Sequence, residues 1–215
     1  MKIELRDANT IMKLSRLGSF HQSKLSFLRS FLREFKDWEY KRDLFDLNKF
    51  GHGVAIYSFK KNDRVYSLIC FANELNEKER SDRVIATKWD AAFTLHDGVP
   101  TKKDIERLKN EVPKQEVGRL SHKELTLSRA NKSVRVFNHV VESLSNGKQP
   151  DIKLLSKVGY LYRTTAVYGS GKFGLADRFR IKNRKEIHGP FRLEMMLVYL
   201  VRQFTFDQVN HVAQE

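Results

Sequence analysis

The sequence predicts an α+β protein, with a small antiparallel sheet and flanking helices followed by a helical, basic second half that contains a short strand pair. Two neighbouring β-type segments, 53–59 and 64–72, are separated by a polar turn, and segments with helical apolar spacing lie before and after them. The 215 residues are 40% hydrophobic, which is enough to bury a substantial core.

The first predicted helix spans residues 23–38. Its apolar residues recur at spacings of three and four, with basic residues between them, as in an amphipathic helix. Segments 53–59 and 64–72 are rich in β-branched and aromatic residues, so they predict an antiparallel hairpin around the polar stretch 60–63. We expect the first helix to cover this small sheet.

Two shorter elements are predicted next. Segment 83–95 has the composition of a third strand or a pair of strands, and the Asp97-Gly98 turn closes it. Thr101 followed by acidic residues is typical of a helix N-terminus, because a hydroxyl caps free N–H groups there. Pro113 then ends this helix.

Residues 121–147 predict one long helix. Ser121 and Glu124 match the capping-box pattern, and an apolar stripe with helical spacing continues to Gly147. The polar side of the predicted helix carries three basic residues, Arg129, Lys132 and Arg135.

The last third of the chain predicts a strand at 160–168 and a final helix at 191–213. Segment 173–181 either returns as a second strand or is irregular. Residues 195–201 contain almost no polar side chain, so we expect that part of the helix to be buried on most sides. An apolar helix so near the last residue is typical of a chain with a missing C-terminal part, or of one whose last helix a partner covers.

The basic residues are concentrated in one segment. The net charge is +14, and residues 119–185 hold 15 Lys/Arg against 4 Asp/Glu, which is +11 of that total. We therefore divide the chain into an α+β region, 1–118, and a basic helical region, 119–215, with one continuous domain as the alternative. Such a positive field attracts an anionic ligand or nucleic acid, although a solvated face that only confers solubility has the same composition.

The composition excludes several classes of protein. Cys70 is the only cysteine, so there is no intrachain disulfide and no thiol zinc cluster, which favours a cytoplasmic location. The seven histidines have no metal-ligand spacing, and we predict no metal site. The longest aliphatic run, 195–201, is too short to span a membrane. No motif specifies a cofactor or a reaction.

A glycine-rich stretch at 168–174 is the strongest candidate site. It lacks the first glycine and the final hydroxyl of a P-loop, and the 41 residues after it are too few for a kinase catalytic loop. It retains exposed backbone N–H groups beside a lysine, which favour an anion. The candidate ligand-binding residues are Arg163, Gly169, Ser170, Gly171, Lys172, Arg178 and His188.

These residues predict a site for a phosphate-bearing ligand, either a nucleotide or a phosphorylated metabolite. The alternative is a non-enzymatic nucleic-acid-binding module that uses segment 119–185 and stacks bases on Tyr160, Tyr162 and Tyr168. A structural domain without a ligand, in which the glycines only form a tight turn, is the third reading.

Segments 162–174 and 204–209 resemble part of a family of longer bacterial proteins that is uncharacterised. The resemblance covers roughly the last third of the chain. It implies that the chain is the N-terminal part of a larger protein, and it brings no activity, cofactor or catalytic residue.

Overall fold

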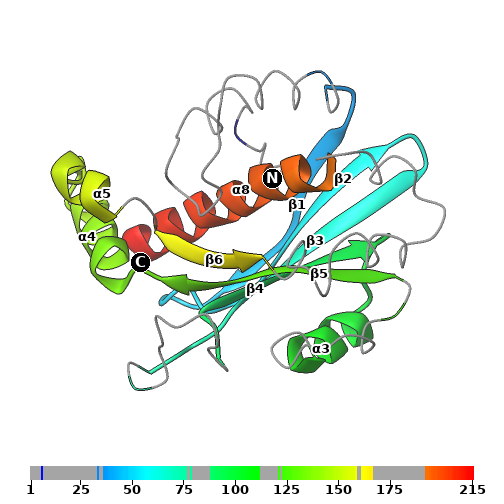
Figure 1. The fold of residues 1–215 in the computed structure, drawn as a ribbon, viewed down its shortest axis with the longest axis horizontal. Coiled ribbons are helices and arrows are strands. Elements are labelled where there is room, and N and C mark those ends of the chain that lie inside the picture. Colours follow the sequence, from blue (N-terminus) through cyan, green and yellow to red (C-terminus); the bar gives the residue numbers. More distant parts are fainter. Residues whose placement is uncertain are drawn as a thin grey trace.

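The structure is a computed structural model. The structure describes residues 6, 33, 36–76, 78, 88–111, 121, 123–158, 161–166 and 192–215. Within these residues the protein is α+β, with one antiparallel sheet and helices on both of its faces (Figure 1).

The sheet has six strands in the order β1 to β6, and each strand is antiparallel to the next. The strands are β1 (Glu39–Leu47), β2 (Gly53–Lys61), β3 (Arg64–Ala72), β4 (Ala91–Asp97), β5 (Glu124–Lys132) and β6 (Tyr162–Ala166). The helices of the described part are α3 (Lys102–Glu111), α4 (Val134–Ser145), α5 (Ile152–Val158) and α8 (Arg192–Gln214).

The predicted hairpin is confirmed as β2 and β3. Lys61 pairs with Arg64, and Asn62 in the turn between them has a positive φ of 54°. Asparagine tolerates this left-handed conformation better than most residues, so the turn follows from local sequence. The third predicted strand is confirmed as β4, which begins at Ala91, whereas residues 83–87 of the predicted segment lie outside the described residues.

The helix predicted after Thr101 is also confirmed. Asp104 N–H donates to the Thr101 hydroxyl at 3.2 Å, and Thr101 N–H donates to the Asp104 carboxylate at 2.8 Å. This reciprocal pair is the capping box that starts α3.

The long helix predicted for 121–147 is wrong over its first half. Residues 124–132 form β5, and helix α4 begins only at Val134, after Ser133 in an extended conformation. Strand β5 lies between β4 and β6, so both of its backbone edges are paired, and this non-local pairing outweighs the local helical spacing. Arg129 and Lys132 therefore lie on a strand and Arg135 on a helix, with no common helical face.

Helix α8 covers one face of the sheet (Figure 1). Its Phe204 ring packs edge-on against Phe93 of β4 with centroids 5.7 Å apart, and Tyr199 packs against Tyr40 of β1 at 4.9 Å. The predicted final helix is thus confirmed, and the burial expected for 195–201 is confirmed at Tyr199, Leu200 and Val201. Of the first predicted helix, 23–38, only Arg33 and residues 36–38 are described, and Trp38 belongs to this same core.

Helix α3 covers the opposite face with a smaller apolar cluster. Leu108 is fully buried against the strands, with Ile105 beside it. The strand residues of this cluster are Val54, Ile56, Ile69, Phe71 and Ala92. The sheet is therefore the middle layer between α8 and α3, while α4 packs against α8.

The second half of the chain continues the sheet. β5 follows the predicted boundary at residue 119, yet it pairs with β4, which precedes that boundary. β6 pairs with β5, so the predicted strand at 160–168 is present as Tyr162–Ala166. Its proposed partner at 173–181 lies outside the described residues. Among the helices that the structure describes, none has the length and apolar character needed to cross a bilayer.

Candidate functional site

The structure describes little of the predicted ligand-binding set. Arg163 lies on β6, where its backbone pairs with Asn131 of β5. The other six residues lie outside the described residues: Gly169, Ser170, Gly171, Lys172, Arg178 and His188.

A basic residue of β5 lies next to β6. Arg129 pairs with Thr165 on one side and with Ala92 of β4 on the other, on the sheet face that α3 covers. Its guanidinium carbon lies 5.0 Å from the centroid of the Trp89 ring, within the range of a cation–π interaction. Burial lowers the pKa of Arg129.

Arg129 has no neutralising partner in the described part of the chain. Its Nε–H is buried and donates no hydrogen bond, because no acceptor of the described residues lies within reach of it. No carboxylate of the described residues forms an ion pair with the guanidinium. A half-buried cation without an anion is unfavourable, since burial removes water that would otherwise stabilise the charge.

Two further buried polar atoms of β4 and the segment before it have no hydrogen-bond partner among the described residues: Trp89 Nε1 and Thr94 Oγ1. Thr94 lies two positions beyond Ala92 on β4, so it projects from the same sheet face as Arg129. Each unsatisfied buried donor costs on the order of 1–3 kcal/mol. The Arg129 guanidinium and the Trp89 ring lie in contact, so their unsatisfied N–H groups make this part of the sheet suited to an acceptor-rich group.

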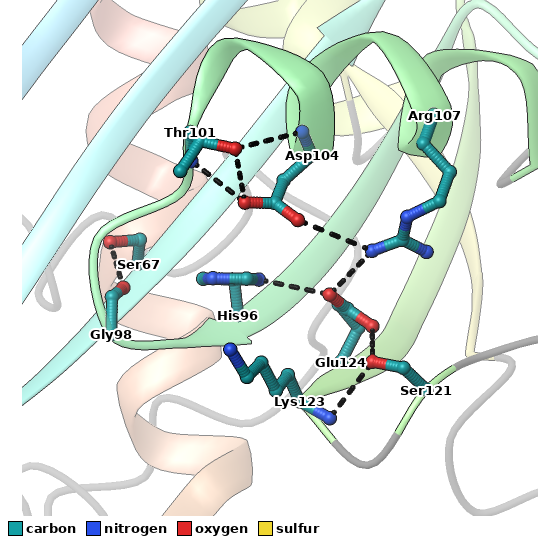
Figure 2. A network of polar contacts seen from close by, with 9 residues as sticks. All are labelled: Ser67, His96, Gly98, Thr101, Asp104, Arg107, Ser121, Lys123 and Glu124. Atoms are coloured by element: carbon teal, nitrogen blue, oxygen red, sulfur yellow. Dashed lines mark hydrogen bonds and ion pairs between the residues drawn. The ribbon is translucent and has the colours of Figure 1, made fainter.

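A second polar cluster lies farther along the same two strands, beneath α3 (Figure 2). Glu124 is fully buried, and one carboxylate oxygen accepts from His96 Nδ1 at 3.1 Å and from Arg107 Nη2 at 2.7 Å. The other oxygen accepts from the Ser121 hydroxyl. Burial alone would raise the pKa of Glu124, but these three donors outweigh it and lower the pKa to about 2.

This cluster anchors α3 to the sheet. Arg107 of α3 contacts both Glu124 and, at 3.6 Å, Asp104 in the first turn of the same helix (Figure 2). The Thr101 bonds lower the pKa of Asp104. Ser121 donates to Glu124 rather than to His96, so no serine–histidine relay of the kind that activates a nucleophile is present in this cluster.

A third polar cluster joins α8 to the sheet. Asp207 lies 2.6 Å from Arg6 Nη1 and 3.2 Å from Arg42 Nη1, and it accepts a 2.7 Å hydrogen bond from the Tyr57 hydroxyl. Burial raises the pKa of Tyr57 well above its usual value, which keeps that hydroxyl protonated as a donor. The buried carboxylate is compensated on both oxygens, so this cluster is structural.

Of the three tyrosines proposed to stack nucleic-acid bases, Tyr162 is not accessible to a base. This residue is fully buried, and its hydroxyl donates to Gln208 of α8 at 2.6 Å. Tyr160 and Tyr168 lie outside the described residues. In the described part of the chain no three His, Cys, Asp or Glu residues gather closely enough to hold a metal ion.

No family model, no curated protein and no solved structure matches this chain. The geometry around Arg129 is therefore the basis for a functional argument. The sequence did contain a signal for β5, because Leu125, Thr126, Leu127 and Ser128 alternate between apolar and polar with a period of two. No local pattern marks Trp89 or Thr94 as neighbours of Arg129, since their proximity comes from strand pairing.

Proposed function

We propose that the protein binds a phosphate-bearing ligand, a nucleotide or a phosphorylated metabolite, between Arg129 and the glycine-rich stretch. The observation that carries this proposal is the half-buried Arg129 guanidinium, which lacks a carboxylate partner in the described part of the chain. Phosphate oxygens would accept hydrogen bonds from the N–H groups of this guanidinium, and the phosphate charge would neutralise the positive charge of Arg129. Arginine suits this role because its planar fork matches phosphate geometry.

The chain path supports a contribution from the predicted residues. Thr165 pairs with Arg129, and β6 ends one residue later at Ala166. Gly169 follows Ala166 by three residues, so the covalent chain limits their separation to roughly 11 Å. We propose that Gly169 to Gly171 supply N–H groups and Lys172 a point charge to the same phosphate. Arg163, Arg178 and His188 remain candidates for its outer oxygens.

Calorimetric titration with inorganic phosphate, pyrophosphate and ATP tests the proposal. We expect saturable binding of at least one of them, weakened at least tenfold in Arg129→Gln and in Lys172→Ala. Arg135→Gln is the matched control, because it removes the same charge from an exposed position on α4. Its affinity should stay within twofold of the unmodified protein.

The rival readings give different results in the same experiment. A nucleic-acid-binding module would ignore the small phosphates and bind a single-stranded oligonucleotide with a steep salt dependence. A structural domain would bind none of these probes. Equal affinity in Arg129→Gln and in the Arg135→Gln control would overturn the proposed site.

A further inference from the structure

A cavity of about 280 Å³ lies between α4, α5 and α8. It shares no residue with the proposed phosphate site. Its lining residues are Val140, Leu144, Gln149, Pro150, Leu155, Leu161, Thr205, Phe206, Val209 and Asn210.

The walls of the cavity are apolar, and its polar groups carry no charge. Val140, Leu161 and Val209 of its lining are buried. The Thr205 hydroxyl donates to the Val201 carbonyl of its own helix at 2.9 Å, which leaves the Gln149 and Asn210 amides as the polar groups of the lining. Among the described residues no charged side chain lines the cavity, although charged residues make up 31% of the chain. A charged ligand would lose its hydration here without compensation, so the lining favours a neutral one.

The turn that forms one wall is held in place by hydrogen bonds. Asp151 N–H donates to His139 Nε2 at 2.9 Å, which ties the start of α5 to α4. Lys148 N–H donates to the Ser143 carbonyl at 2.8 Å and closes the end of α4. The cavity is present without a ligand, and these contacts fix the turn that lines it, so binding requires little reorganisation.

We propose that this cavity binds a small neutral molecule with an aromatic or aliphatic body and one hydrogen-bonding group. The cavity volume of about 280 Å³ lies near the lower end of the roughly 300–1,000 Å³ typical of small-molecule pockets, so it suits a small ligand such as a bicyclic aromatic molecule. Pockets between packed helices with few, convergent polar groups are common sites for such ligands. The amide of Gln149 or Asn210 would hold the polar group.

Indole is a suitable neutral probe, and indole-3-acetate is its anionic counterpart. Titration followed by methyl NMR should give saturable shifts at Val140, Leu144 and Val209 with indole, and at least tenfold weaker binding of indole-3-acetate. Leu155→Trp should fill the cavity and weaken indole binding at least tenfold. Ile152→Trp is the matched control, because Ile152 lies on the same helix, is 75% exposed and does not line the cavity.

Three results would overturn the proposal: the absence of saturable shifts at the cavity methyl groups, equal binding of the anionic probe, and equal weakening by both tryptophan variants. The wild-type titration decides the matter even if Leu155→Trp fails to fold. Phosphate binding should be unchanged in Leu155→Trp, and indole binding unchanged in Arg129→Gln, so the two sites are tested independently.

Discussion

The Tyr162 hydroxyl donates a 2.6 Å hydrogen bond to Gln208 Oε1, and Gln208 Nε2 donates in turn to the Gly51 carbonyl at 2.7 Å. One buried amide of α8 thus joins β6, at one edge of the sheet, to the turn between β1 and β2, near the other. This bridge explains why a helix with polar residues at its centre is buried, because those polar groups replace their water contacts with protein partners.

We expect Tyr162→Phe to lower the free energy of unfolding by about 1–3 kcal/mol, because Gln208 Oε1 would then be buried without a donor. Urea denaturation measures this change. The double variant Tyr162→Phe/Gln208→Met should lose less than the sum of the two single variants, since removing both partners leaves fewer unsatisfied atoms. Strict additivity would mean that the hydrogen bond contributes nothing in solution.

Glu124 should make stability depend on pH at the acidic end. Its folded-state pKa of about 2 lies below its ordinary value of 4.5, so its contribution is complete above pH 4.5 and is lost as the pH falls toward 2. The loss should be on the order of 3 kcal/mol. In Glu124→Gln this pH-dependent part should disappear, whereas Glu142→Gln, at an exposed position on α4, should keep it. Unfolding free energies at pH 7, 5, 3 and 2 would show whether the two variants differ.

Two glycines with positive φ should respond differently to alanine. At Gly53, φ is +148° and an added Cβ would lie 2.0 Å from the Asp46 carbonyl oxygen of β1, so the backbone must shift. At Gly98, φ is +96° but nothing lies within 4 Å of the added Cβ. We expect Gly98→Ala to cost about 1–3 kcal/mol from the backbone conformation alone. Gly53→Ala should cost clearly more in the same thermal or urea unfolding experiment, and an equal cost would contradict the predicted collision.

Arg129 should reduce stability when no anion is bound. Replacing a half-buried, uncompensated cation with an apolar side chain of similar length removes a desolvation penalty, so Arg129→Met should leave stability unchanged or raise it by about 1 kcal/mol in phosphate-free buffer. The unmodified protein should gain melting temperature on addition of the phosphate ligand, and the variant should not. A variant that melts lower than the unmodified protein in both buffers would show that Arg129 has a structural role instead.

Local sequence was sufficient for several elements. The Asn62 turn set the β2–β3 hairpin, the Thr101–Asp104 pair set the start of α3, and the apolar content of 191–213 predicted a buried helix. The hairpin turn and the start of α3 were predictable because their stabilising contacts lie within a few residues of one another in the chain. The final helix was predictable because its apolar composition requires burial.

The tertiary structure alone decided the rest. Residues 124–132 have both a helical apolar spacing and a strand-like alternation, and only pairing with β4 and β6 selects the strand. The same pairing removes the expected basic helical face and places Arg129 beside Trp89 and near Thr94, residues 40 and 35 positions earlier. Composition had already indicated a basic protein, for which we predicted an anionic ligand or nucleic acid as partner. Which cation lacks a counter-charge depends on what lies next to it in space, and contacts between distant segments determine that.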